Sequence, residues 1–353
     1  MLNDKKLLLV NQHNLALVSN GFRKIYSTVF NSECPVDRFG LLDKIGINDT
    51  VPLVNMVPKP VYKLTGLTTD WQDRYQSIYS QVAEKVYATS GTRDIVVMYS
   101  GGVDSAGVLV ALMQRPEYQE FLDAGRFRVA MTTASINEYP ELFYRDILPN
   151  IPIEPTDYNT LMMDPNVLLV TGDDGDHVIG NTGTPNLLNH DDSCLHLPKH
   201  AAYPYFDHAD PTGLLSTIVG QLDPYCPFEI VSLCQLHWWV GQCFELQATM
   251  CRPYYWSHIS DLSEITTNQK VFRFFMDDLW NTFSFEYMST NPVYTDNVSI
   301  RDFPKQYIVG ITGDSNYLNK VKVKSQKLTC RIRTKTRIYE DLTYAMDNRK
   351  IIV

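Results

Sequence analysis

The sequence predicts an α/β protein built on a parallel sheet with flanking helices. Two uninterrupted apolar runs, at 95–99 and 167–170, are typical of strands buried on both faces of a sheet. Segments with helical spacing alternate with the strands, which implies crossover connections and parallel pairing. The ligand site of such a sheet lies at the carboxyl ends of its strands, so the chemistry is expected there.

Two regions are expected along the chain. Residues 1–68 form a small β-rich N-terminal region, in which the apolar segments 7–10 and 15–18 flank a polar turn and predict a hairpin. Residues 69–353 form the α/β domain, whose C-terminal half has apolar residues at helical spacing. The expected architecture is therefore one large α/β domain with a short β-rich attachment.

The elements of the α/β domain follow from local patterns. Thr69-Asp70-Trp71-Gln72 is typical of a capping box and starts a helix that reaches about Ala88. A second cap pattern starts at Ser135. The expected elements are helices at 69–88, 106–113, 135–148, 214–222 and 272–283, and strands at 95–99, 127–133 and 167–170.

The composition excludes several classes of protein. Hydrophobic residues make up 44% of the 353 residues and charged residues 20%, as in ordinary globular proteins. No apolar run approaches the roughly 20 residues of a membrane-spanning helix, and none suits the core of a signal peptide, so we expect a cytoplasmic protein with no membrane partner. The seven cysteines form no CxxC pair, which argues against a disulfide framework and a zinc ribbon.

The charge is unevenly distributed. The net charge is −9, but eight of the 31 Lys and Arg residues lie at 320–337, where no acidic residue occurs. The rest of the chain has 23 basic residues against 40 acidic ones. The sequence thus combines an acidic body with one strongly basic segment.

The strongest motif follows the strand at 95–99 and reads Ser100-Gly101-Gly102-Val103-Asp104-Ser105. Two glycines allow a tight turn, the serine hydroxyls add hydrogen-bond donors, and the N-terminus of the following helix favours a phosphate anion. The carboxylate of Asp104 suits a Mg²⁺ ion that bridges phosphate oxygens. Neither a Walker loop nor a GxGxxG fingerprint is present. The motif predicts a cradle for pyrophosphate.

This hexapeptide resembles the signature loop of the ATP pyrophosphatase (PP-loop) superfamily, which includes asparagine synthetase, GMP synthetase, NAD synthetase and several tRNA-modifying enzymes. The resemblance implies an adenine nucleotide alpha hydrolase-like fold and cleavage of ATP between its α- and β-phosphates. It implies that pyrophosphate is held by Ser100, Gly101, Gly102, Asp104 and Ser105.

A second motif, Thr171-Gly172-Asp173-Asp174-Gly175-Asp176-His177, directly follows the strand at 167–170. It resembles the Ser-Gly-Glu-Gly-x-Asp-Glu motif of the asparagine synthetase synthase domain. The resemblance implies that Gly172 lies against the nucleotide, that Asp173 acts near the acyl and amine substrates, and that Asp176 joins Asp104 at Mg²⁺. An alternative is a structural Asx turn at a helix start.

The chain also departs from that family. Asp173 replaces a glutamate, His177 replaces the last glutamate, and the first cysteine is Cys34, so no N-terminal nucleophilic cysteine is present. About 65 residues precede the synthase-like part, fewer than the roughly 100 of a typical domain. We therefore expect a synthase-like domain without a working glutaminase, and the acyl substrate and amine donor remain open.

The basic segment has three interpretations. Lys320, Lys322 or Lys324 neutralises charge on the leaving pyrophosphate, in weak resemblance to the lysine-bearing part of asparagine synthetase. Alternatively, the strip at 320–337 tracks the phosphate backbone of a nucleic acid. The structural alternative is a solvated strand face.

Two further groups of residues have alternative roles. His190, His196 and His200 are spaced unlike any zinc motif, so a polar loop is favoured over a metal site. Trp238 and Trp239 either stack on a planar substrate or, at helical spacing, belong to the core.

The sequence thus predicts an AMP-forming ligase that uses ATP and Mg²⁺. It adenylates a carboxylate or an amide-like oxygen of a small-molecule acyl substrate, and an amine donor then displaces AMP. The alternatives are a PP-loop enzyme that modifies a base in tRNA or DNA, and a non-catalytic ATP-binding protein of the same fold. The oligomeric state is not specified.

Overall fold

The computed structural model describes residues 70–155, 158–173, 175–179, 228–240, 270–291 and 302–320, three short strands within residues 6–56, and the single positions 198, 200 and 226. The chain divides into two compact units. The first unit comprises Met1–Thr68, Asp176–Cys251 and Asn281–Ile300, and the second comprises Thr69–Gly175, Arg252–Trp280 and Arg301–Val353.

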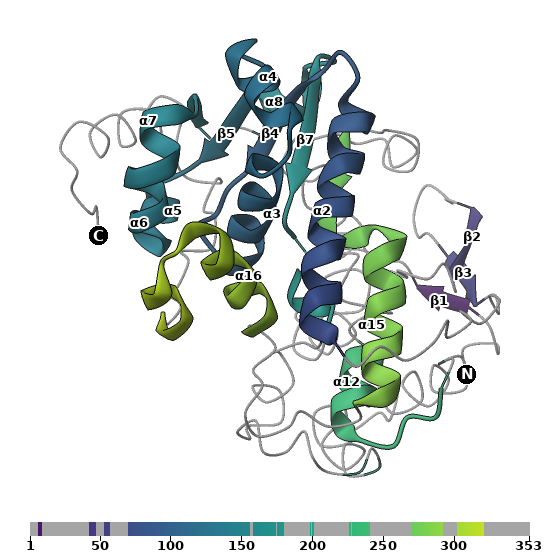
Figure 1. Cartoon of the computed structure of the whole chain (residues 1–353). Coiled ribbons are helices and arrows are strands. Elements are labelled where there is room, and N and C mark those ends of the chain that lie inside the picture. The colour runs from purple at the N-terminus through teal and green to yellow at the C-terminus, as the bar shows by residue number, and fades with distance from the viewer. Residues whose placement is uncertain are drawn as a thin grey trace. The chain divides into compact units, whose positions relative to one another are not determined.

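A five-stranded parallel sheet forms the centre of the second unit (Figure 1). Its order is β6-β5-β4-β7-β8, so the strand that comes first in the chain lies in the middle. The strands are β4 (Asp94–Met98), β5 (Phe127–Met131), β6 (Ile153–Pro155), β7 (Val167–Thr171) and β8 (Val271–Arg273). The predicted α/β class with a parallel sheet and flanking helices is confirmed.

The two middle strands are the most deeply buried. Every residue of β7 is buried, and so is every residue of β4 after Asp94, as expected for apolar runs covered on both faces. The strands pair in register from Asp94 opposite Val167 to Met98 opposite Thr171. Because both strands end at the same level, the loops that follow them emerge side by side.

Helices flank the sheet along the whole unit. Those between the strands are α3 (Val103–Met113), α4 (Glu117–Asp123), α5 (Thr133–Glu138), α6 (Pro140–Leu142), the π-helical η2 (Phe143–Ile147), α7 (Leu148–Asn150) and α8 (Tyr158–Met163). The others are α2 (Trp71–Ser90), α16 (Asp302–Thr312) and the 3₁₀ turns η8 (Phe274–Met276) and η9 (Ser315–Asn319).

Two helix starts differ from the prediction. The side chain of Asp70, not of Thr69, caps α2 by accepting a 2.9 Å hydrogen bond from the Asp73 backbone N–H. Thr132 caps α5 in a capping box, and Ser135 is the partner within that box. The helix expected to reach residue 148 is also broken after Tyr139, because Pro140 starts a new segment.

The segment 272–283, expected to form one helix, divides into a strand, a 3₁₀ turn and the start of a helix. Phe272 lies in β8, Phe275 lies in the 3₁₀ turn that follows, and α15 (Asp278–Thr290) begins only after Asp277. Phe272 and Phe275 are three residues apart, as in a helix, so periodicity could not separate a short strand from a helical turn.

Aromatic side chains join α2, α3 and α16. The ring of Tyr79 on α2 stacks on Tyr307 of α16, with ring centroids 4.0 Å apart. The position of Gly107 on α3 is also against Tyr79, where a Cβ atom would come within 2.5 Å of the Tyr79 hydroxyl oxygen. Lys85 of α2 forms an ion pair with Asp277 at 2.8 Å. These contacts fix α3, and with it the loop at its N-terminus.

The first unit contains a small antiparallel sheet of order β1-β3-β2, with strands β1 (Lys6–Leu8), β2 (Leu42–Gly46) and β3 (Leu53–Met56). Antiparallel strands thus occur in the region expected to be β-rich. However, β1 pairs with β3, and the partner expected at 15–18 lies outside the described residues, as does the helix expected at 214–222.

Polar contacts in the first unit centre on Ser284 of α15. Its hydroxyl donates to the Val178 carbonyl and accepts from the indole N–H of Trp238 on α12 (Leu233–Val240). Trp238 and Trp239 are both 1% exposed. Their side chains belong to the core, and the interpretation of a stacking surface for substrate is wrong.

No helix among the described residues could span a membrane.

The glycine contact in α3 predicts opposite effects for two similar substitutions. Gly107→Ala pushes against the stacked ring of Tyr79 and lowers the free energy of unfolding by about 1–3 kcal/mol. Gly310→Ala, in α16, meets no atom within 4 Å and raises it by about 0.5–1 kcal/mol through helix propensity. Urea denaturation of both variants checks the account, and a stabilising Gly107→Ala would contradict it.

Candidate functional site

The candidate site starts at the loop between β4 and α3. Helix α3 begins at Val103, three residues earlier than predicted, so Asp104 and Ser105 lie in its first turn. The first turn of a helix leaves backbone N–H groups without intrahelical acceptors and carries a partial positive charge. The loop Ser100–Gly102 and the first turn of α3 therefore form a surface suited to an anion.

The hydroxyl of Ser105 holds this loop in shape. Its oxygen accepts a 3.1 Å hydrogen bond from the Ser100 backbone N–H and donates to the Gly102 carbonyl at 3.1 Å. The Ser100 hydroxyl oxygen lies 3.0 Å from it and accepts from the Gly102 N–H at 3.3 Å. Both hydroxyls thus bond within the loop and occupy the N–H groups of Ser100 and Gly102. The N–H groups of Gly101 and of the first turn of α3 are therefore the principal anion donors.

Gly101 occupies a position that no other residue fits without strain. Its φ angle is +78°, in the left-handed region. A Cβ atom there would collide with the Ser135 carbonyl oxygen and lie 2.7 Å from the Cβ atom of Glu138. The glycine loop is therefore packed directly against α5, the helix that follows β5.

The loop after β7 approaches the first turn of α3 equally closely. A Cβ atom at Gly172 would lie 2.9 Å from both the backbone nitrogen and the Cα atom of Ser105. One at Gly175 would lie 2.6 Å from the carboxylate carbon of Asp104. The two sequence motifs, about 70 residues apart, thus meet at the carboxyl ends of β4 and β7.

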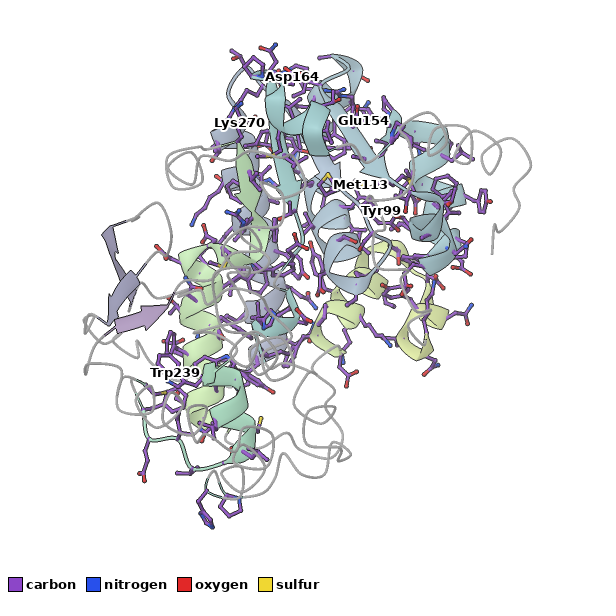
Figure 2. All side chains as sticks on the ribbon, turned by 180° about the vertical axis from the view of Figure 1, so that it is seen from behind. Tyr99, Met113, Glu154, Asp164, Trp239 and Lys270 are labelled. Carbon is purple, nitrogen blue, oxygen red and sulfur yellow. The ribbon has the colours of Figure 1, made fainter. Side chains whose placement is uncertain are left out.

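This meeting point lies where the strand order reverses. From β4, the chain continues to β5 and β6 on one side and returns to β7 and β8 on the other. Ligands of open α/β sheets bind at such a point, outside the carboxyl ends of the strands. Figure 2 shows Tyr99, which follows β4, at the end of the sheet away from Asp164 and Lys270, which precede β7 and β8.

The acidic residues of the second motif take separate positions. Asp173 lies in a turn directly after Gly172 and is partly exposed. Asp176 begins the segment Asp176–Cys251, which belongs to the first unit. Its carboxylate lies 3.7 Å from the imidazole of His177. Asp104 belongs to the second unit, so the expected pairing of Asp104 with Asp176 stays a prediction.

The carboxylate of Asp104 also acts on the tyrosines of α2. Burial raises the pKa of Tyr75 and of Tyr79 well above the ordinary tyrosine value, and the charge of Asp104 adds to the increase. Both hydroxyls therefore stay neutral at physiological pH. Asp104 thus lies near two buried, neutral tyrosines and supplies a negative charge at the start of α3.

Lys320 is the one residue of the basic segment at 320–337 that lies within the described residues. Its ammonium nitrogen lies 3.8 Å from a carboxylate oxygen of Glu141 and 4.7 Å from the ring centre of Tyr139. Partial burial lowers its pKa, and Glu141 opposes the decrease. The predictions for Lys322, Lys324 and a nucleic-acid strip concern residues outside this set.

Other sequence hypotheses are only partly covered. His190 and His196 are outside the described residues, and His200 is described as one isolated position. The described residues contain no group of three or more His, Cys, Asp or Glu side chains that could hold a metal ion. Sequence reasoning missed Tyr139, Tyr317 and Glu138, because their place beside the glycine loop depends on long-range packing.

Comparisons with known proteins do not add to this description. No family model, no curated protein and no solved structure matches the chain. The resemblance to ATP pyrophosphatases therefore rests on the two loop motifs and on where they lie in the sheet.

The glycine loop predicts a contrast between neighbouring substitutions. Gly101→Ala combines a left-handed backbone with a collision at α5 and lowers the free energy of unfolding by about 1–3 kcal/mol. Gly102→Ala changes it by less than about 0.5 kcal/mol, because Gly102 has an extended backbone and its nearest neighbour is the Ser100 hydroxyl oxygen at 3.3 Å. Equal effects of the two substitutions in chemical denaturation would contradict this geometry.

Proposed function

We propose that the protein is an AMP-forming ligase of the ATP pyrophosphatase type. It activates an acyl oxygen with ATP, releases pyrophosphate and transfers the acyl group to an amine. The observation that carries the proposal is the contact of the two motif loops, through Gly172 at Ser105 and Gly175 at Asp104. Two loops that resemble one enzyme's nucleotide site lie together at the switch point of a parallel sheet.

The parts of this site have distinct roles in the proposal. The N–H groups of Gly101 and of the first turn of α3 hold the β- and γ-phosphates. Gly172 lets the loop after β7 lie against the first turn of α3, beside which the nucleotide would bind. Asp173, directly after Gly172, acts near the acyl and amine groups. The five-stranded order matches the first five strands of a doubly wound nucleotide-binding sheet, which supports the adenine nucleotide alpha hydrolase-like assignment.

The residues present fit a magnesium ion at Asp104. Its carboxylate lies at the N-terminus of α3, and Gly175 has no side chain to cover it. Mg²⁺ takes one or two carboxylates plus phosphate oxygens, so Asp104 would hold it together with the phosphates. Bound there, the ion supplies positive charge to the phosphate oxygens.

The proposed reaction has two steps. In the first, an oxygen of the substrate's carboxylate attacks the α-phosphorus of ATP, the bond to the bridging oxygen breaks, and pyrophosphate leaves with the electron pair. In the second, the amine attacks the acyl carbon, AMP leaves, and the nitrogen loses a proton as the amide forms. Main-chain N–H groups of the glycine loop stabilise the negative charge on the leaving pyrophosphate.

The product pattern tests this function. With ATP, Mg²⁺ and a mixture of amino acids and dicarboxylic acids as acyl substrates, we expect AMP and pyrophosphate in equal amounts. Asp104→Asn lowers this turnover by at least about 100-fold, because a carboxylate at the phosphates is lost. Asp123→Asn, on exposed α4, retains it. Formation of ADP and phosphate, or an Asp104→Asn variant with full activity, would refute the proposal.

A second substitution probes the metal position without removing a carboxylate. A methyl group in Gly175→Ala pushes against the Asp104 carboxylate and raises the Mg²⁺ concentration for half-maximal activity by about 10-fold. Gly310→Ala, which meets no neighbour, is the matched control. Magnesium titrations at saturating ATP distinguish the two, and an unchanged requirement in Gly175→Ala would argue against Asp104 as a ligand.

A further inference from the structure

A lysine in the second unit lies beside two stacked tyrosine rings. The rings of Tyr139 and Tyr317 stack with their centres 4.2 Å apart. The ammonium nitrogen of Lys320 lies 4.7 Å from the centre of the Tyr139 ring and 5.8 Å from that of Tyr317. Both distances are within the range of a cation–π interaction. We call Tyr139 and Tyr317 the tyrosine pair.

The tyrosine pair is built from two distant parts of the chain. Tyr139 lies between α5 and α6, and its hydroxyl donates a 3.2 Å hydrogen bond to a carboxylate oxygen of Asp314. The other carboxylate oxygen of Asp314 accepts from the Asn316 N–H and caps η9, which contains Tyr317. One carboxylate thus fixes the ring of Tyr139 and the turn that presents the second ring.

The backbone at Lys320 is also fixed. The ammonium group of Lys305, on α16, donates to the carbonyl oxygens of Leu318 and Lys320 at 2.8 and 3.0 Å. Helix α16 itself packs against α3, and through the Tyr79–Tyr307 stack it also packs against α2. The position at which the Lys320 side chain leaves the main chain is therefore set relative to the helix that starts in the glycine loop.

The tyrosine pair adjoins the glycine loop on the β5 side. Tyr99, the residue before Ser100, is 2% exposed. Its pKa is raised, first by burial and then by Tyr317, Tyr139 and Glu138, so these side chains lie close to it. The backbone of Gly101 is against Ser135 and Glu138 of α5, which directly precedes Tyr139. A continuous set of contacts thus joins the phosphate loop to the lysine.

Lys320 is partly buried beside three carboxylates. Burial lowers its pKa, but Glu141, Glu138 and Asp314 each oppose the decrease. The nearest carboxylate oxygen, of Glu141, is at 3.8 Å, beyond hydrogen-bonding distance, and no described residue accepts a hydrogen bond from the ammonium nitrogen. The tyrosine rings stabilise the cation through their faces and occupy none of its donors.

We propose that Tyr139, Tyr317 and Asp314 are positioning residues that hold the Lys320 ammonium group for the pyrophosphate bound in the glycine loop. This inference rests on the proposed function and identifies which lysine of the basic segment serves it and what orients that lysine. Lys320 is the group that touches the pyrophosphate, while the tyrosine pair acts through it.

Chemical labelling of lysines tests the proposal. Wild-type protein is treated with trace acetic anhydride, with and without Mg²⁺-pyrophosphate, and acetylation of Lys320 is quantified by mass spectrometry against Lys85. Lys85, paired with Asp277 on another part of the unit, is the internal reference. We expect Mg²⁺-pyrophosphate to slow acetylation of Lys320 by at least about fivefold and to leave Lys85 unchanged.

Matched variants separate positioning from folding. Tyr139→Leu and Tyr317→Leu remove a ring face and reduce the protection of Lys320 to less than about twofold. Tyr317→Phe retains both ring faces and the hydrogen bond of Tyr139 to Asp314, and keeps most of the protection. Thermal unfolding of each variant in parallel establishes that it is folded. For a Leu variant that does not fold, the corresponding comparison is made with Tyr→Met, whose flexible, unbranched side chain also lacks the ring.

Calorimetry with pyrophosphate and with ATP separates the two possible failures. Wild-type protein that binds neither overturns the proposed function and this inference with it. Wild-type protein that binds them without protecting Lys320 overturns only the inference. Full protection in folded Leu variants likewise refutes the role of the tyrosine pair while leaving the nucleotide site intact.

Discussion

The contact between the β7 loop and the first turn of α3 is the constraint on which the candidate site depends. Met98 and Thr171 are register partners, so β4 and β7 end at the same level. Gly172 and Gly175 then allow the second loop to approach the first closely. A Cβ atom at either position would lie less than 3 Å from backbone or carboxylate atoms of the first loop. At Gly172 the neighbouring atoms belong to the backbone of Ser105 and cannot rotate away.

The core of the second unit maintains this contact. Apolar strands buried on both faces fix the sheet. Helix α3 packs against α2, where Gly107 meets Tyr79, and against α16, which α2 contacts through the Tyr79–Tyr307 stack. Because α3 starts inside the glycine loop, a shift of this helix would move the loop with it. The stability of the core and the geometry of the candidate site are thus linked through one helix.

Much of this arrangement could be predicted from the sequence. The buried strands at β4 and β7, the long helix α2 and the loop motifs all depend on local patterns, and the parallel sheet follows from their alternation. Exact helix caps could not be assigned, because Asp70 and Thr132 compete with equally suitable neighbours. The strand β8 is only three residues long, which is too short to show an alternating hydrophobic pattern.

The surroundings of Lys320 could not be predicted from the sequence for a different reason. Tyr139 and Asp314 are 175 residues apart, and nothing in either segment indicates that a hydroxyl of one bonds to a carboxylate of the other. Similarly, the partner of Gly101 on α5 becomes visible only when the backbone is folded. Residue types predicted the chemistry of the site, whereas packing decides which charged groups lie beside it.

A crystal structure of the full chain with Mg²⁺ and α,β-methylene-ATP, which cannot be cleaved between its first two phosphates, tests the central claim most directly. The account predicts that the β- and γ-phosphates lie on the main chain of Ser100–Gly102 and the first turn of α3, with the metal ion at Asp104. A nucleotide bound away from the carboxyl ends of β4 and β7, or no nucleotide at millimolar concentration, would contradict it.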